Sequence, residues 1–263
     1  MGHSVAQAID FTGKVVIVTG GGRGVGRGIS ERFLECGAQV VICGRSTPES
    51  LPTAGGREAV FTAADVRELE QIESVVDFTC KRFGRLDTLV NNAGGAPAAD
   101  AATVSPRFSE SIIRLNFISG LHFAQKANAV MQQQEDGGSI ISITSVSALR
   151  PSPGTAAYGA AKAGLISLTQ TLAVEWAPKV RLNTVSAGMI RTEQSHLHYG
   201  DEEGIRAVGA TVPLGRLGEP QEVGDACIFL ASPLASYVSG ANLLIHGGGE
   251  RPAFLGAAKP GSN

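Results

Sequence analysis

Seven short apolar runs alternate with longer segments of helical pattern, and this alternation limits the fold more than any other feature of the sequence. Within most runs the apolar residues are consecutive, which is typical of strands buried on both faces of a parallel sheet. Parallel neighbours need long crossover connections, which the helical segments provide. We therefore predict an α/β fold with a doubly wound, seven-stranded parallel sheet and helices on both faces. The predicted strands are residues 14–19, 39–43, 59–64, 86–90, 139–144, 180–185 and 242–245.

The helical segments carry apolar residues at intervals of three and four. Between residues 67 and 83, Ile72, Val75, Val76 and Thr79 lie at positions i, i+3, i+4 and i+7, which is the spacing of one helix face. The same criterion, with proline and glycine residues marking several ends, defines the other helices. The predicted helices are residues 25–36, 67–83, 106–134, 157–176 and 219–230.

No break in composition divides the chain, so we predict a single domain over residues 1–263. The irregular stretch 191–215 is too long for an ordinary connection and is a candidate lid. Apolar residues make up 43% of the chain and charged residues 17%, which excludes a disordered protein. A net charge of −2 gives no electrostatic signal for nucleic acid or an anionic membrane.

The remaining general features indicate a cytoplasmic protein. No apolar stretch approaches the ~18 residues that a membrane span requires, and the first residues lack the pattern of a signal peptide. The four cysteines form no CxxC pair, so we expect reduced thiols rather than disulfides. Two histidines, His196 and His198, lie close together in the irregular stretch, but no third ligand is placed near them and we predict no metal site.

A glycine-rich loop follows the first predicted strand. Residues 19–26 read TGGGRGVG and lead directly into the first predicted helix. Glycines in this position allow a tight turn and a close approach to a pyrophosphate, which then rests on the helix N-terminus. The loop therefore predicts a dinucleotide site.

The end of the second predicted strand bears on which dinucleotide binds. An acidic residue there would bind the ribose of NAD, but this sequence has Arg45 followed by Ser46 and Thr47. Arg45, together with Arg23 of the glycine loop, would pair with the 2′-phosphate of NADP. We predict that NADP(H) is preferred and that NAD(H) remains possible.

Tyr158 and Lys162 lie one turn apart on a predicted helix, about 5–6 Å from each other at Cβ. A free phenol titrates near ~10, and an adjacent ammonium favours the phenolate. We therefore predict a lowered pKa for Tyr158 and a role as a general acid or base. Ser145 comes just after the fifth predicted strand, at the edge where ligands of parallel sheets bind.

These motifs together resemble the single-domain short-chain dehydrogenase/reductase family, and in particular its 3-oxoacyl and hydroxysteroid oxidoreductases. The resemblance extends over nearly the whole chain and implies a Rossmann-like fold. Its motifs are residues 19–26, Asp65 with Val66, residues 91–94 (NNAG), Asn116, Ser145, and Tyr158 with Lys162.

The resemblance implies a role for each catalytic position. Tyr158 would transfer the proton, and Ser145 would hydrogen-bond the substrate oxygen. Lys162 would hold the nicotinamide ribose, and Asn116 would hold a relay water through its backbone. Asp65 and Val66 would contact the adenine, Asn92 its ribose, and Ile190 with Thr192 the carboxamide. The positions assigned to the cofactor are Gly20, Arg23, Gly24, Val25, Gly26, Arg45, Asp65, Val66, Asn92, Ala93, Gly94, Tyr158, Lys162, Ile190 and Thr192.

Two positions depart from the family pattern. Ala187 stands where a proline is usual after the sixth strand, and His246 stands where an aspartate is usual before the final glycines. Both departures affect local geometry near the nicotinamide rather than the reaction class. The resemblance also implies a homotetramer.

The substrate is predicted from the walls of the cleft. Side chains such as Leu149, Leu197 and Leu214 suggest an apolar lining, and hence a hydrophobic ketone or secondary alcohol, such as an acyl thioester or a steroid. Two other functions stay open. One is a catalytically silent, cofactor-binding regulator on the same fold, which the intact Ser145, Tyr158 and Lys162 disfavour. The other is an epimerase or dehydratase of the same family.

Overall fold

The computed structural model describes residue 7 and residues 9–258, and its seven-stranded sheet is entirely parallel. The strand order is β5-β2-β1-β6-β7-β8-β9, so the chain winds outward in both directions from β1. This doubly wound arrangement confirms the predicted fold class. The strands are β1 (Val15–Thr19), β2 (Gln39–Gly44), β5 (Val60–Ala63), β6 (Thr88–Asn91), β7 (Gly138–Ser145), β8 (Val180–Ala187) and β9 (Asn242–Ile245).

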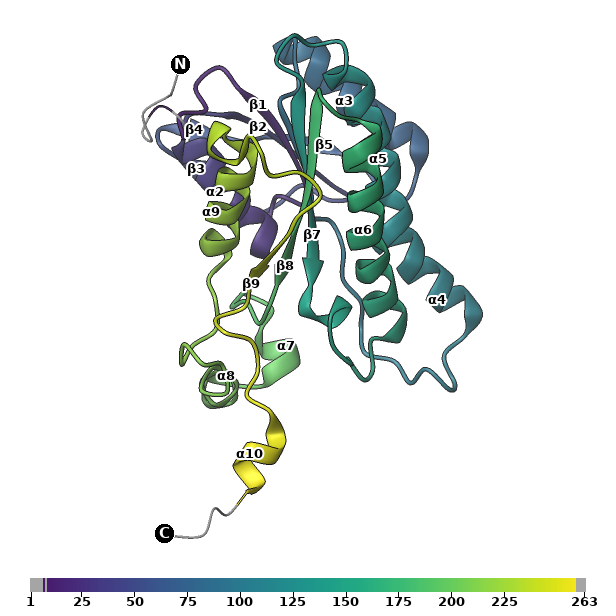
Figure 1. Ribbon diagram of the computed structural model, residues 1–263, viewed down its shortest axis with the longest axis vertical. Coiled ribbons are helices and arrows are strands. Elements are labelled where there is room, and N and C mark those ends of the chain that lie inside the picture. The colour runs from purple at the N-terminus through teal and green to yellow at the C-terminus, as the bar shows by residue number, and fades with distance from the viewer. Residues whose placement is uncertain (1–6, 8, 259–263) are drawn as a thin grey trace.

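Helices cover both faces of the sheet, as Figure 1 shows. On one face lie α2 (Gly24–Glu35) and α9 (Pro220–Ala231), which pack against each other. On the other face lie α3 (Leu69–Phe83), α5 (Ser119–Met131) and α6 (Ala156–Glu175). The remaining helical elements are α4 (Pro106–Ile113), η1 (Arg114–Ile118), η2 (Val146–Ala148), α7 (His196–Tyr199), α8 (Glu202–Gly209), η3 (Pro233–Ala235) and α10 (Ala253–Ala257).

Each face of the sheet has its own apolar core. Val16 and Val18 of β1 face α2, where Ile29 and Phe33 are fully buried. Ile17, between them on the same strand, points to the opposite face and joins the core beneath α3 and α5. Every residue of β1 is buried, because a central parallel strand is covered by helices on both sides.

The structure contains local features that the sequence pattern did not predict. The predicted helix 106–134 is divided by the π-helical turn η1, which carries Asn116. A short antiparallel hairpin, β3 (Thr53–Ala54) with β4 (Arg57–Glu58), precedes β5. The stretch 191–215 contains α7 and α8 instead of being irregular. All of these elements are too short to produce a clear periodicity.

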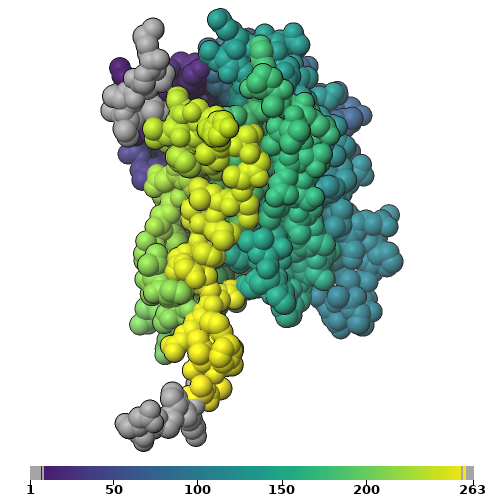
Figure 2. Space-filling view, in the orientation of Figure 1, coloured from purple at the N-terminus to yellow at the C-terminus, as the bar shows by residue number. Residues whose placement is uncertain are grey.

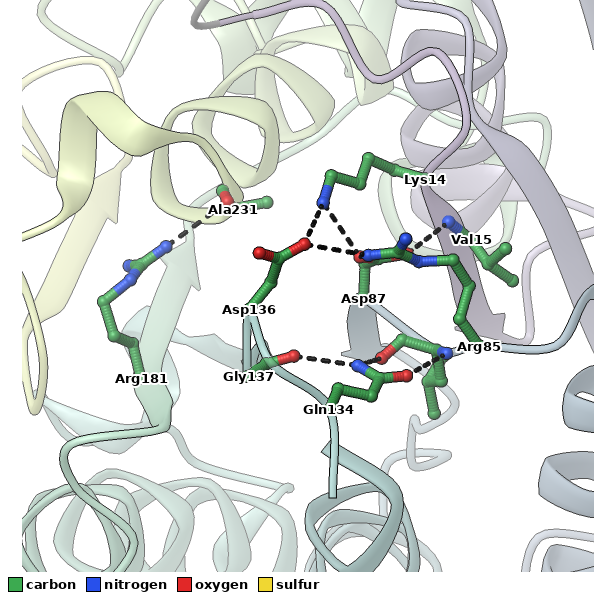
Figure 3. Close-up of polar contacts among 10 residues, drawn as sticks. Lys14, Val15, Arg85, Asp87, Gln134, Asp136, Gly137, Arg181 and Ala231 are labelled. Atoms are coloured by element: carbon green, nitrogen blue, oxygen red, sulfur yellow. Dashed lines mark hydrogen bonds and ion pairs between the residues drawn. The ribbon is translucent and has the colours of Figure 1, made fainter. Parts of the chain in front are cut away.

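A network of ion pairs and hydrogen bonds connects the amino-terminal ends of the strands (Figure 3). The buried carboxylate of Asp87 accepts a hydrogen bond from the Val15 amide at 2.9 Å and from Arg85 Nε at 2.8 Å. Lys14 Nζ lies 3.2 Å from Asp87 and 3.3 Å from Asp136. These contacts anchor the start of β1 to the start of β6. They lie at the amino ends of the strands, opposite the carboxyl ends where ligands of parallel sheets bind.

The carboxyl edge of the sheet is covered by the segment between β8 and α9. In Figure 1 the ends of β7, β8 and β9 face α7 and α8, while α10 projects away from the body of the molecule, as it also does in Figure 2. Within the described part of the chain, the structure contains no helix of the length and apolarity needed to cross a membrane.

Candidate active site

The glycine-rich loop lies at the carboxyl end of β1 and leads into α2. Gly24, the first residue of the helix, has a φ of +51°, a conformation that favours glycine. A Cβ at Gly26 would lie 2.3 Å from the Gly20 carbonyl oxygen, so only glycine allows the helix to approach the strand this closely. Helix α2 has neither a side-chain cap nor an acidic residue in its first turn. Its N-terminal amides are therefore suited to bind an anion.

Asn92 and Thr19 hold this loop against the end of β6. The Asn92 side-chain amide donates to the Thr19 carbonyl at 2.9 Å, and the Thr19 hydroxyl accepts from the backbone amides of Asn92 and Ala93 at 2.9 Å each. These bonds connect two segments that lie more than seventy positions apart in sequence. Asn92 thus has a clear structural task in shaping the loop, in addition to the ribose contact expected for it.

The two arginines expected at the 2′-phosphate are both exposed. Neither the Arg23 nor the Arg45 side chain makes a hydrogen bond or ion pair within the described part of the chain, so both cations are available to a ligand. Asp65 differs, because Arg67 holds its carboxylate with contacts of 2.5 and 2.9 Å. The hydrogen bonds from Arg67 lower the pKa of Asp65 to about 2.

The strand β7 and the helix α6 bring the predicted catalytic residues together. Ser145 is the last residue of β7, and its hydroxyl accepts a hydrogen bond from the Ser147 amide at 3.1 Å. The Lys162 ammonium lies 5.7 Å from the centre of the Tyr158 ring. It is only 3% exposed and donates to the Ile143 carbonyl at 2.9 Å. The spacing of one helical turn therefore does place the cation beside the phenol.

The direction of the Tyr158 pKa shift is contrary to the prediction. Burial raises the pKa of the phenol above its usual value of 10, and a hydrogen bond with Ser145 offsets this only in part. Burial also lowers the pKa of Lys162 to about 8, because the ammonium has lost its hydration. Desolvation is thus the largest cause of both shifts, and it outweighs the effect of their proximity.

Asn116 lies in the π-helical turn, and its side chain holds the loop that follows β6. Its Oδ1 accepts from the Gly95 amide at 2.8 Å, and its Nδ2 donates to the Gly95 carbonyl at 2.9 Å. A cavity of about 10 Å³ lies between Asn116, Lys162 and the end of β1. That volume is about the size of one water molecule, and its lining is partly polar.

A row of hydroxyl groups continues from Ser145 along the loop between β7 and α6. Ser147 Oγ lies 3.1 Å from Ser152 Oγ, which in turn accepts from Thr155 Oγ1 at 2.8 Å. We call Ser147, Ser152 and Thr155 the hydroxyl row. The neighbouring apolar residues predicted a different lining, although serine and threonine are frequent between residues 142 and 155.

Several of the apolar side chains expected in the cleft face solvent instead. Leu149, Leu197 and Leu214 are 51%, 67% and 71% exposed. At the edge of the same region, Arg150 of the β7–α6 loop forms an ion pair with Glu250, which follows β9. The surroundings of the catalytic side chains are therefore more polar than the sequence suggested.

The segment after β8 lies over the glycine loop. Ile190 forms a parallel bridge with Gly218, and Arg191 pairs with Glu202 at 2.9 Å. The Thr192 side chain lies 3.5 Å from the position that a Cβ at Gly24 would take. The Glu193 carboxylate accepts a hydrogen bond from the Gly24 amide at 3.1 Å, a contact that no sequence motif indicated.

The two departures from the family pattern lie side by side at the ends of β8 and β9. Ala187 is the last residue of β8, and the Gly188 amide after it donates to the Ile245 carbonyl at 2.9 Å. A Cβ at Gly188 would lie 2.8 Å from His246. Tight packing against β9 therefore fixes this turn without the usual proline.

The residues at this edge fit a nicotinamide dinucleotide. The start of α2, whose Val25 and Gly26 amides have no acceptor among the described residues, suits the pyrophosphate, and the unpaired Arg23 and Arg45 side chains lie at the end that would hold the adenosine. Tyr158 and Lys162 lie on the other side, beside the end of β7. The arrangement can transfer a proton at the phenol next to a bound cofactor.

Comparison with known proteins agrees with this geometry. A family model described as enoyl-(acyl carrier protein) reductase matches residues 20–250. The chain is 37% identical to an L-rhamnose 1-dehydrogenase (NAD(P)(+)) of Azotobacter vinelandii, covering 89% of this chain and 96% of the relative. It is also 37% identical to an L-fucose dehydrogenase of Bos taurus, covering 94% and 93% of the two chains.

Solved structures give the same result. The ligand-free aldohexose dehydrogenase of Thermoplasma acidophilum superimposes with a TM-score of 0.84 at 32% identity, covering 97% of this chain and 98% of that one. The chain therefore belongs to the short-chain dehydrogenase/reductase family, as a nicotinamide-dependent oxidoreductase of a small-molecule substrate.

Proposed function

We propose that the protein is a sugar dehydrogenase that uses NADP(H) and oxidises the anomeric hydroxyl of an aldopyranose to a lactone. The observation that carries the proposal is the hydroxyl row beside Ser145, because hydroxyl groups both donate and accept hydrogen bonds, as the substituents of a sugar do. The Arg150–Glu250 pair adds charged partners at the same edge. The relatives are named for rhamnose, fucose and aldohexoses, which also favours a sugar over a steroid or thioester.

In this mechanism Tyr158 accepts the proton of the sugar hydroxyl as C1 loses its hydride. When bound, NADP⁺ supplies the hydride acceptor. Ser145 donates a hydrogen bond to the reacting oxygen and keeps it in line with the phenol. The Lys162 ammonium stabilises the phenolate, whose formation burial would otherwise oppose.

The proton then has a route away from the phenol. Lys162 borders the small cavity that also reaches Asn116, and one water there would connect the cation to the π-helical turn. π-helical turns are frequent at functional sites. We assign Asn116 to this relay and the segment 191–215 to a lid over the substrate.

A homotetramer is also part of the proposal. Its support is apolar surface that no described residue covers. Val174 of α6, Leu234 of η3 and Leu244 of β9 are exposed. Such side chains are typical of contacts between subunits.

A substrate panel tests the function. With NADP⁺, we expect aldopyranoses such as L-rhamnose, L-fucose and D-glucose to be oxidised, and steroid alcohols and 3-hydroxyacyl thioesters to react at least about a hundredfold less efficiently in kcat/KM. Reduced nicotinamide absorbance gives the rate, and lactone formation identifies the carbon oxidised. Efficient turnover of steroids or thioesters, with no sugar reacting, would contradict the proposal.

The cofactor preference depends on Arg45. Replacing it with alanine is expected to raise the Kd of NADPH by about tenfold, because a charge-assisted contact to the 2′-phosphate is lost. The Kd of NADH should change by less than about twofold. Fluorescence titration measures both. The control is Arg107→Ala, which removes the same charge from the exposed surface of α4. A wild-type protein that binds NADH more tightly than NADPH would overturn the assignment.

A further inference from the structure

We propose that Glu193 is an internal competitor for the pyrophosphate of the dinucleotide, and that it sets how tightly the cofactor binds. Its carboxylate accepts a hydrogen bond at 3.1 Å from the Gly24 amide, which is the first N–H group of α2. The two residues are 169 positions apart, so the contact is a product of the tertiary fold. The inference requires only the nicotinamide cofactor and holds for any substrate.

At the start of α2, one backbone amide donates to Glu193 and the next two have no described acceptor. Arg23 at the N-cap makes no side-chain capping bond, and the first turn contains no acidic residue. The amides of Val25 and Gly26 have no acceptor among the residues that the structure describes. The Glu193 carboxylate is therefore the one described anion in contact with the start of α2, where the N–H groups suit a phosphate.

A hydrogen-bonded turn presents this carboxylate to the helix. The Thr192 amide donates to Ser195 Oγ at 2.8 Å, and the Ser195 amide donates back to the Thr192 carbonyl at 3.0 Å. Ser195 itself is buried, so the turn is anchored in the protein. Glu193 and the pyrophosphate are thus directed to the same amides, where two negative charges in contact repel each other.

A neighbouring cavity of about 480 Å³ gives the displaced side chain a place to go. It lies between α2, the segment after β8, and the start of α9, and Glu193 is part of its wall. Its two arginines are already paired, Arg27 with Glu31 and Arg191 with Glu202. The cavity therefore accommodates the carboxylate without replacing the contact that it loses at Gly24, and cofactor binding has to overcome that loss.

The test compares Glu193→Gln with Glu203→Gln. Glu203 is exposed in the first turn of α8, and its side chain has no hydrogen-bond partner among the described residues, so its replacement removes the same charge without touching α2. We expect Glu193→Gln to lower the Kd of NADPH by about threefold to tenfold, and Glu203→Gln to leave it within about 1.5-fold. Isothermal titration calorimetry measures both.

A second ligand tests whether the gain in affinity arises at the pyrophosphate site. Adenosine 2′-monophosphate reaches the arginine end of the site but has no pyrophosphate, so its affinity should be the same in wild type and Glu193→Gln. An unchanged or raised Kd for NADPH in Glu193→Gln would refute the proposal, as would an equal gain for the monophosphate. Because the readout is binding alone, a failure of the sugar proposal leaves this result unaffected.

Discussion

Replacing Tyr158 with phenylalanine is expected to lower kcat by about a thousandfold while NADPH still binds with its wild-type affinity. The phenol is the one group beside Ser145 and Lys162 that can accept the substrate proton at the site proposed here, and general base catalysis is worth about 10²–10⁴-fold. Phenylalanine keeps the ring and its packing, so the fold should not change. Steady-state rates with a reactive sugar and a calorimetric titration with NADPH measure the two effects.

The matched control for this variant is Tyr237→Phe. Tyr237 is fully exposed and makes no described contact with Ser145, Tyr158 or Lys162, so the same chemical change there should leave kcat within about twofold. Near-normal activity of Tyr158→Phe would remove the phenol from the mechanism. A loss of NADPH binding equal to the loss of activity would instead assign Tyr158 a role in holding the cofactor.

Replacing Lys162 with methionine is expected to lower kcat by at least about a hundredfold and at the same time to make the protein more stable at neutral pH. The activity falls because the phenolate loses its neighbouring cation. The stability rises because the ammonium is buried, and its one described hydrogen bond, to the Ile143 carbonyl, does not replace its lost hydration.

The effect of Lys162 on the free energy of unfolding depends on pH. Burial lowers the pKa of Lys162 to about 8, from 10.5 for an unburied lysine. Between these values the unfolded chain binds more protons at this site than the folded protein, so the contribution of Lys162 to the free energy of unfolding rises with pH. The stability advantage of Lys162→Met over wild type should therefore be largest below pH 8 and shrink as the pH approaches 10.

Urea unfolding of both proteins between pH 7 and 10 measures the difference. Burial raises the pKa of Cys43 to about 12 and also raises that of Cys227. Both thiols therefore lower the free energy of unfolding as the pH rises above 9, in wild type and variant alike. Only the difference between the two proteins reports on Lys162. Lys81→Met, on the exposed side of α3, should show no such pH-dependent difference. A Lys162→Met variant less stable than wild type at pH 7 would show that the ammonium stabilises the fold.

Much of the site could be predicted because its signals are local. The spacing of Tyr158 and Lys162 depends only on the pitch of a helix, and the position of Ser145 depends only on where a buried strand ends. The glycine loop follows from the same logic, since a Cβ at Gly26 would collide with Gly20 only six residues away. These features lie within single elements or single turns.

Other features of the site came from contacts that local patterns do not contain. The sequence predicted an apolar cleft from residues such as Leu197, but side chains near a loop in sequence can point to either side of it, and Leu197 faces solvent. The hydroxyl row is visible as composition, yet its continuity depends on how the β7–α6 loop folds back on itself.

By itself the sequence determined the parallel sheet, the glycine loop at the start of the first helix and the placement of Lys162 beside Tyr158, because strand burial, helical pitch and glycine conformation act over short distances along the chain. Only the tertiary structure decided that burial raises the pKa of Tyr158 and that the carboxylate of Glu193 meets the first amide of α2. Desolvation and contacts between distant residues depend on what surrounds a group in space. That environment exists only once every strand and helix has packed in place.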